Sequence, residues 1–411
     1  MSKQRRKKKQ SNFILPFFIT LTFVVLIGLF FMFSYLWIMT DTKTRHSNFQ
    51  LTKEQIPAEE QVKEIIGQND KYADVLQDEE YMIENNIYAK EAASEECVTI
   101  SFAGDILFDP NYSVMSTLLQ NGGHISNGIK PDVIAEMESA DIMMLNNEFP
   151  YTNRGTPTAG KQFTFRADPS TVSHLYDMGV DIVSLANNHA YDYGEQGFLE
   201  TLETLQNAGI PYVGAGVNEE EALKPVYYIM NNMKIAFVSA TQIEKGDYPD
   251  TIGATVDSPG VFRCWNVEKL LQVVAEAKAN SDFVIVYIHW GTENQEGTDW
   301  AQDEQAPQIV AAGADLIIGA HPHILQKIDV IDGVPIIYSL GNFWFNSKTI
   351  DTGIVKVTLT EEGLQSYQFI PCLQSGCKTT LLTGTEKERV LNKMQAMSGR
   401  VQIDSEGYVT W

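Results

Sequence analysis

Short apolar runs, rich in β-branched residues, recur along the chain from residue 98 to residue 340. Six of them have the length of buried strands: 98–103, 141–145, 180–185, 283–288, 314–318 and 336–340. Segments with helical spacing lie between them, and we expect helices at 130–138, 169–178, 195–208, 266–280 and 301–312. Asp168 before Pro169 is a helix start signal, and Gly179 and Gly209 stand where helices should end. Strands that alternate with helices predict an α/β domain with parallel strands.

The pattern changes after residue 350. Residues 354–359 and 364–369 alternate apolar and polar side chains around a Glu-Glu-Gly turn, which predicts an antiparallel hairpin on a second sheet. A closing helix is expected at 385–399. The roughly 270 residues of alternating elements suffice for one large core, so the sequence does not require two domains.

The chain opens with a basic stretch and a long apolar run. Six of the first nine residues are Lys or Arg, and residues 13–39 carry no charge. A membrane-spanning helix needs about 20 apolar residues, whereas the core of a cleaved signal peptide has about 7–15. We therefore expect a transmembrane helix at 13–39 and a cytoplasmic tail at 1–12; a cleaved signal peptide is the alternative. This arrangement predicts a single-pass protein of the cell membrane with its main domain outside the cell.

The remaining chain divides by composition. Residues 40–96 are rich in Glu and Asp and predict a partly helical extracytoplasmic stalk, followed by the main domain at 97–371 and a C-terminal extension at 372–411. The net charge of −23 argues against nucleic acid as a partner, because phosphate binding needs Lys and Arg surfaces. The four cysteines lack the spacing of a zinc site; Cys372 and Cys377 are close enough for a disulfide, but free thiols are equally compatible with the sequence.

Polar side chains follow each of the six predicted strands. They include Asp105, Glu148, Asn188, His189, His289, His321, His323 and Asn342. The carboxyl ends of parallel strands meet on one rim of an α/β sheet, so these side chains should lie close together. Carboxylates mixed with imidazoles suit Mn, Fe or Zn rather than calcium. No phosphate-binding P-loop and no Gly-x-Ser-x-Gly elbow occurs, which leaves NTPase and serine hydrolase functions without support.

These strand ends form a motif series that resembles the CapA (PgsA) family of poly-γ-glutamate capsule synthesis proteins. The series is Gly104-Asp105, Asn147-Glu148, Asn187-Asn188-His189 with Asp192 and Gly194, His289-Trp290-Gly291-Thr292-Glu293, Gly319-Ala320-His321-Pro322-His323 and Ser339-Leu340-Gly341-Asn342-Phe343. The motifs follow the family order within residues 98–371. The family is similar in fold to calcineurin-like metallophosphoesterases, which implies two facing sheets with helices outside, a four-layer α/β/β/α sandwich.

The resemblance also implies roles for individual residues. The implied metal ligands are Asp105, Glu148, Asn188, His289, His321 and His323. His189 would be a general acid or substrate clamp, with Asp192 orienting its ring. Two departures stand out: Ile106-Leu107 follows Asp105 where phosphoesterases carry Asp-x-His, and Glu148 stands where they carry Asp. The first departure removes an imidazole from one metal position, so both one ion and two ions are compatible with the sequence.

The substrate-binding residues are less sharply marked. Arg154, Lys161 and Arg166 follow Glu148 and could bind an anionic polymer, although they could equally be ordinary loop charges. Glu293 and Asn342 are further candidates for substrate contact; a surface carboxylate and a turn residue are the alternatives.

Two functions follow from these observations. The first is a membrane-anchored protein that assists the synthesis, export or anchoring of poly-γ-glutamate or a similar anionic polymer, together with membrane-embedded polymer synthases. The second is a metal-dependent phosphoesterase or other hydrolase at the cell surface.

Overall fold

A computed structural model describes residues 67, 69–244 and 251–411, which all belong to one compact unit. The predicted basic tail and transmembrane helix at 13–39 lie outside the described residues. Within the described part of the chain, no helix combines the length and the apolar character needed to cross a membrane.

Seven strands form the first sheet, in the order β1-β7-β8-β10-β11-β13-β12. Their bounds are β1 Ile87–Ala89, β7 Val226–Met230, β8 Met233–Thr241, β10 Phe283–His289, β11 Leu316–Ala320, β13 Val334–Ile337 and β12 Ile328–Ile331. Strands β8, β10, β11 and β13 run parallel to one another, so their carboxyl ends meet at one edge.

Eight strands form the second sheet, in the order β17-β16-β15-β2-β3-β4-β5, with β14 paired to β2 beside this path. The bounds are β17 Lys378–Leu381, β16 Gly363–Ser375, β15 Ile350–Thr360, β2 Val98–Ile106, β3 Ile142–Asn147, β4 Ile182–Ser184, β5 Tyr212–Val213 and β14 Asn342–Trp344. Strands β2 to β5 and β14 are parallel, whereas β15, β16 and β17 pair antiparallel.

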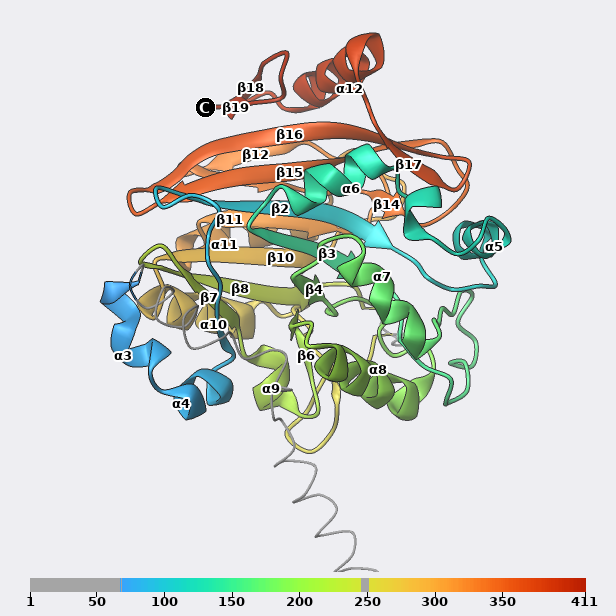
Figure 1. Ribbon diagram of the computed structural model, residues 1–411, viewed down its shortest axis with the longest axis horizontal. Coiled ribbons are helices and arrows are strands. Elements are labelled where there is room, and N and C mark those ends of the chain that lie inside the picture. Colours follow the sequence, from blue (N-terminus) through green and yellow to red (C-terminus); the bar gives the residue numbers. More distant parts are fainter. Residues whose placement is uncertain (1–66, 68, 245–250) are drawn as a thin grey trace, which may run out of the picture. The chain divides into compact units, whose positions relative to one another are not determined.

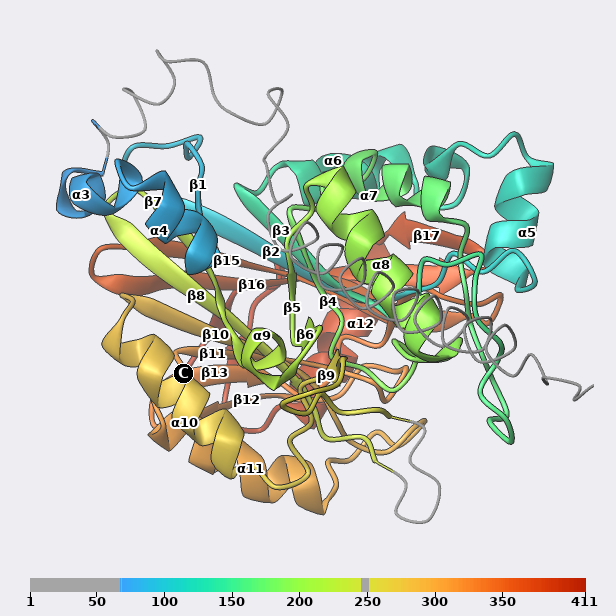
Figure 2. The same cartoon turned by 90° about the horizontal axis from the view of Figure 1, so that it is seen from below.

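Helices cover the outer faces of the two sheets. Figure 2 shows α10 (Glu268–Ala279) and α11 (Trp300–Ala311) on one side of the strands. On the other side lie α6 (Pro131–Glu138), α7 (Ser173–Tyr176) and α8 (Gly194–Ala208). Helix α12 (Gly384–Met397) lies beyond β16 in Figure 1. The shorter elements are η1 Asp70–Tyr72, α3 Ala73–Leu76, α4 Glu79–Glu84, α5 Ser113–Gln120, η2 Ile125–Asn127, η3 Pro169–Val172, β6 Ala215–Gly216, α9 Glu219–Leu223, β9 Gly260–Val261, β18 Gln402–Ile403 and β19 Val409–Thr410.

Three apolar cores lie between the layers: one between the two sheets and one beneath the helices on each side. Alternate residues of one strand enter different cores: Ile285 and Tyr287 of β10 pack between the sheets, whereas Val284 and Val286 pack beneath α10 and α11. The second sheet behaves in the same way, with Phe102 between the sheets and Ala103 beneath the helices. Strands buried on both faces need apolar side chains at nearly every position, which explains the continuous runs in the sequence.

All six predicted strands are present, and the predicted hairpin is β15–β16. The hairpin joins β2 in the second sheet. The predicted helices are present too, although the segment 169–178 is only a short 3-10 turn followed by α7. The β7–β8 hairpin was not predicted, although β8 lies in the interior of the first sheet.

Two predicted boundaries were wrong. Residues 372–411 are not an extension, because β17 pairs with β16 and the apolar face of α12 packs into the core between the sheets. The predicted stalk also ends too late, since β1 pairs with β7 and Val75 and Leu76 pack against the core of the first sheet. All four cysteines lie in the described part of the chain and are free thiols.

Candidate metal centre

The polar residues that end the strands meet at one edge of the molecule. Asp105 lies in β2, Glu148 follows β3 directly, and His289 is the last residue of β10. Asn188 follows β4, His321 and His323 follow β11, and Asn342 opens β14. Each is buried except His323, whose side chain is 17% exposed. The structure thus brings these residues, which the sequence singled out, to one place; their roles as ligands stay predictions.

One group of donor atoms surrounds the Nε2 atom of His289. The Oδ1 atom of Asn188 lies 2.9 Å away, Nδ1 of His321 lies 3.0 Å away, and Oε1 of Glu148 lies 3.8 Å away. Ligand atoms of Glu148, His289 and His321 all fall within 4.8 Å of one another. This first ligand group can offer two oxygens and two imidazole nitrogens to one cation.

A second group shares Glu148. The Nδ1 atom of His323 lies 3.2 Å from Oδ2 of Asp105 and 2.8 Å from Oδ1 of Asn342. The other ring nitrogen of His323 lies 3.9 Å from Oε1 of Glu148. Asp105, Glu148 and His323 again place ligand atoms within 4.8 Å of one another. Glu148 thus belongs to both groups, which is the arrangement required of a bridging carboxylate.

The pKa shifts of Glu148 and His289 suit the binding of a cation at this site. Oε1 of Glu148 is buried and accepts no hydrogen bond from any described residue. Burial raises the pKa of Glu148 well above its usual range, and the nearby Asp105 carboxylate adds to the rise. Burial also lowers the pKa of His289 well below its usual value, with the charges of His321 and His323 contributing. Imidazole binds metals in its neutral form, and a cation would supply the missing partner of the Glu148 oxygen.

Backbone strain marks the same place. His321 and His323 have φ angles of 95° and 61°, in the left-handed region that non-glycine residues seldom adopt. Such conformations cost on the order of 1–3 kcal/mol each and cluster at functional sites. Behind the centre, a Cβ on Gly104 would lie 1.9 Å from the carbonyl oxygen of Gly341. The missing side chain lets the Asp105 N–H donate to that oxygen at 3.0 Å, which sets Asp105 beside Asn342.

His189 lies at the edge of the centre on a turn after β4. Its Nδ1 atom lies 2.7 Å from Oδ2 of Asp192, and its ring centroid lies 4.2 Å from that of Phe165. Burial lowers the pKa of His189, and the Asp192 carboxylate opposes part of this effect. A carboxylate on Nδ1 fixes the ring orientation, which leaves Nε2 to carry any exchange of protons with a ligand.

The predicted substrate-binding cations are engaged elsewhere. The exposed Arg154 places Nε 3.4 Å from Oε1 of Glu200, and the guanidinium of Arg166 lies 4.8 Å from the ring centroid of Tyr193. Lys161 is buried against Asp192. The side chain of Glu293 is exposed, yet its charge raises the pKa of both Glu148 and His323, which places it near the centre. Their roles in substrate binding stay predictions.

Sequence reasoning assigned no role to two buried amides beneath the centre. Asn146 donates through Nδ2 to Oδ1 of Asp105 at 2.7 Å, and Asn187 donates to Oδ1 of Asn146 at 3.0 Å. Each amide directly precedes another asparagine at a strand end, so the doublets Asn146-Asn147 and Asn187-Asn188 were the available signal.

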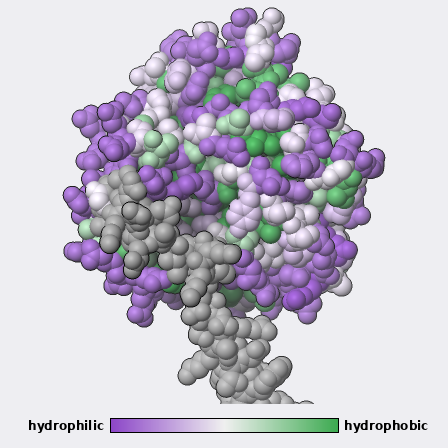
Figure 3. Space-filling view, viewed as in Figure 1, coloured by the Kyte–Doolittle hydropathy of each residue, from purple (hydrophilic) through white to green (hydrophobic). Residues whose placement is uncertain are grey.

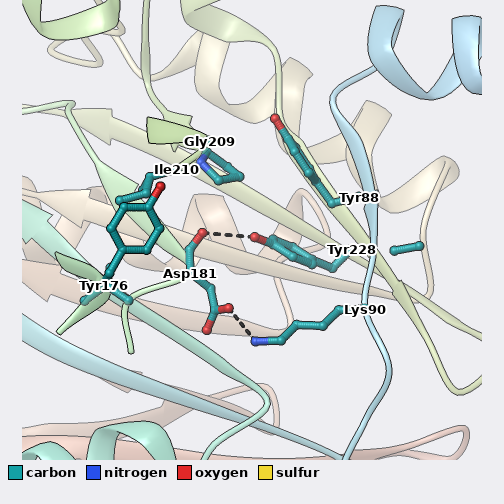
Figure 4. A pocket seen from close by; sticks show the side chains of 10 residues that line it. Tyr88, Lys90, Tyr176, Asp181, Gly209, Ile210 and Tyr228 are labelled. Atoms are coloured by element: carbon teal, nitrogen blue, oxygen red, sulfur yellow. Dashed lines mark hydrogen bonds and ion pairs between the residues drawn. The ribbon is translucent and has the colours of Figure 1, made fainter. Parts of the chain in front are cut away.

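A separate pocket of about 260 Å³ lies at the amino ends of β4 and β5 (Figure 4). Asp181 and Pro211, which precede β4 and β5, line it together with Tyr88 and Tyr228. Lys90 forms an ion pair with Asp181, and the Tyr228 hydroxyl donates to the Asp181 carbonyl oxygen at 3.0 Å. The charged side chains of this pocket therefore pair with each other.

The molecular face in Figure 3 is largely hydrophilic, with scattered apolar patches.

Comparisons with known proteins agree with the motif series. The family model "Bacterial capsule synthesis protein PGA_cap" matches residues 99–347. The chain is 31% identical to the PGA biosynthesis protein CapA of Bacillus subtilis over 68% of its length and 72% of that protein. It is 29% identical to the capsule biosynthesis protein CapA of Bacillus anthracis, over 73% of each chain. A probable polyglutamine synthesis accessory protein of Mycobacterium tuberculosis is 26% identical over 66% of this chain and 76% of its own.

Among solved structures, a protein of Thermus thermophilus named TT1561 aligns over 66% of this chain and 97% of its own, with 11% identity and a TM-score of 0.34. This likeness is too weak to carry an argument.

Proposed function

The chain belongs to the family of bacterial capsule synthesis proteins PGA_cap, and from that premise we propose that it serves in the synthesis, export or anchoring of poly-γ-glutamate or a similar anionic capsule polymer. Its relatives carry names from capsule and polyglutamate biosynthesis. The observation that carries the chemical part of the proposal is the pair of ligand groups that share Glu148. We therefore propose that the domain is a metallophosphoesterase-like sandwich that binds one or two transition-metal ions.

The residues that would hold the ions are those of the two groups: Asp105, Glu148, Asn188, His289, His321 and His323, with Asn342 beside them. The donor set of oxygens and imidazoles suits Mn, Fe or Zn. Such ions polarise a bound ester or amide and lower the pKa of bound water. The Oδ1 atom of Asn342 lies 2.8 Å from Nδ1 of His323, so its amide oxygen is a candidate further ligand of the second group.

The roles of the other side chains follow from their own chemistry. Glu148 is shared by the two groups, where burial and the Asp105 carboxylate raise its pKa, and the neutral imidazole of His289 keeps a lone pair available. His189 would donate a proton through Nε2 to a leaving group, or clamp an anionic group of the ligand. Asp192 would hold that ring in place.

A second candidate function is hydrolysis at the cell surface, by a metal-dependent phosphoesterase or a related hydrolase. The His189–Asp192 pair beside the ligand groups favours it, because a binding site alone has no need of an oriented proton donor. The two candidates differ in one measurable respect. An accessory role without hydrolysis predicts that the metal-loaded chain does not turn over a phosphodiester probe, whereas a hydrolytic role predicts turnover that His189→Ala abolishes.

We also propose that residues 13–39 anchor the protein in the cell membrane, with residues 1–12 in the cytoplasm and the α/β domain outside. The length and composition of that run support the proposal. Membrane-embedded polymer synthases would then be the nearest partners. Protease treatment of intact cells tests the topology: the domain should be accessible, and an inaccessible domain would contradict it.

The first experiment measures the metal content of the purified full chain in detergent, beside a His321→Ala/His323→Ala double variant. About one or two Mn, Fe or Zn ions per wild-type chain, lost from the double variant, are expected. His124→Ala is the matched control, because His124 is exposed and belongs to neither ligand group. A wild-type chain that takes up no metal after incubation with Mn and Zn would overturn the metal proposal and leave polymer binding alone.

A further inference from the structure

The segment from Thr158 to Phe165 is tied to one buried acidic residue, Asp192. The Thr158 N–H donates to the Asp192 carbonyl oxygen at 2.8 Å, and the Phe165 N–H donates to Oδ2 at 2.7 Å. Lys161 donates to Oδ1 at 2.6 Å. Since His189 shares Oδ2 with Phe165, every acceptor atom of Asp192 serves either this segment or the candidate proton donor.

Lys161 is buried more deeply than a substrate-binding lysine would be. Its side chain is 5% exposed and that of Asp192 is not exposed at all, whereas the Lys356–Glu136 pair is 19% and 26% exposed. A second N–H of the same ammonium donates to the backbone carbonyl of Asn188. An ammonium has three N–H groups, and two of these are taken by protein acceptors. Lys161 is therefore poorly placed to bind an anionic polymer.

We infer that Lys161 is a positioning residue: it fixes the Asp192 carboxylate, and through Asp192 it fixes the ring of His189 beside the candidate centre. The same ammonium holds the backbone of Asn188, so one side chain sets the relation between the candidate proton donor and a candidate ligand. The inference rests on the proposed function, because it assumes that His189 acts on a bound ligand.

The physical reason is the cost of an unpaired charge in a buried place. Without the ammonium, Asp192 would be a buried carboxylate with Oδ1 unpaired and its charge unbalanced, so nothing would hold the carboxylate in the rotation that places Oδ2 on His189. The ring of His189 would then lose its defined orientation. Partners of this kind, which hold an acting residue in place, typically change activity or affinity by 10–100-fold when they are removed.

The test compares Lys161→Met with wild type in the metal-loaded full chain, with bis(p-nitrophenyl) phosphate as the probe. We expect kcat to fall about 10–100-fold, KM to change by less than about two-fold, and metal content to stay the same. Lys356→Met, which breaks a partly buried ion pair between β15 and α6, is the matched control and should leave both constants unchanged. A raised KM with normal kcat would instead make Lys161 a substrate-binding residue and overturn the inference.

A double-mutant cycle separates positioning from general damage to the fold. Once Asp192→Asn has removed the charge that Lys161 serves, adding Lys161→Met should cost little further activity. Equal and independent losses in the two backgrounds would refute the coupling.

A spectroscopic readout keeps the inference testable if wild type does not hydrolyse the probe, which would count against hydrolysis and not against positioning. In protein with ¹⁵N-labelled histidine, the His189 Nδ1–H signal, assigned with His189→Ala, should be present in wild type and in Lys356→Met and lost in Lys161→Met. Its persistence in Lys161→Met would show that Asp192 holds His189 without Lys161.

Discussion

Replacing Glu148 with Gln isolates the charge that the two ligand groups share. The substitution keeps the shape of the side chain and removes its negative charge. In the structure that charge is fully buried, its Oε1 atom accepts no hydrogen bond from a described residue, and the Asp105 carboxylate is close by. A buried oxygen without a partner destabilises the folded state, and a neighbouring like charge adds to the effect.

The sign of the effect should depend on metal. Without metal, Glu148→Gln removes an ionisable group whose pKa is raised by burial and by Asp105, so the free energy of unfolding near pH 7 should rise, by about 1.4 kcal/mol for each pH unit of that rise. With metal, wild type gains about 2.7 kcal/mol when the free ion is at 100 times its dissociation constant, whereas a variant without the shared ligand gains little. The order of the two stabilities should therefore reverse when metal is added.

Denaturant unfolding of the full chain, in EDTA and in excess Mn, measures the free energy of unfolding without and with metal. Glu293→Gln is the matched control, because it removes an exposed carboxylate near the same centre and should show no reversal. If Glu148→Gln lowers stability in EDTA as well as in Mn, then protein groups alone stabilise the charge. The reasoning about a shared ligand would then be wrong.

Three further predictions test other parts of the structure. His189→Ala should lower turnover of a phosphodiester probe by about 100-fold or more while metal content is retained; undiminished turnover would remove His189 from the chemistry. Gly104→Ala should cost about 1–3 kcal/mol or more, because its Cβ would lie 1.9 Å from the Gly341 oxygen, whereas Gly399→Ala meets nothing within 4 Å and should be nearly neutral by denaturant unfolding. Burial alone would raise the pKa of Asp282, but hydrogen bonds from Lys71, Tyr72 and the Lys234 N–H bring it below its usual value. A lowered folded-state pKa gives stability that is present above the unfolded value of about 3.9 and is lost as the pH falls through the folded value. Asp282→Asn should therefore lower the free energy of unfolding by about 0.2–1 kcal/mol at pH 7 and by little near pH 2–3. A loss that does not change with pH would contradict this.

Much of the site could be predicted because it depends on a local rule. Parallel strands that are buried on both faces appear in the sequence as apolar runs. The carboxyl ends of such strands lie at one edge of the sheet that they share, so the residues that follow them in that sheet are neighbours. This rule groups Asp105 with Glu148 on one sheet and His289 with His321 on the other, without knowledge of strand order. Only the family resemblance, which implied two facing sheets, predicted that the two edges would meet.

Contacts that depend on long-range packing could not be predicted in this way. Lys161 and Asp192 are joined across an irregular segment, so the sequence showed a cation near an anionic site but not its burial. The C-terminal boundary failed for a related reason: α12 is polar on most of its surface, and only the fold shows that Val390, Leu391 and Met394 enter the core.

The ligand groups draw on both sheets, and this has a mechanical consequence. Asp105 and Glu148 extend from the eight-stranded sheet, whereas His289, His321 and His323 extend from the seven-stranded sheet. An ion held by both sets would act as a cross-link between the two halves of the sandwich, at the edge where their strands end. With all four cysteines present as free thiols, no disulfide joins the two sheets, and removing the ion with a chelator would leave packing alone to hold this edge together.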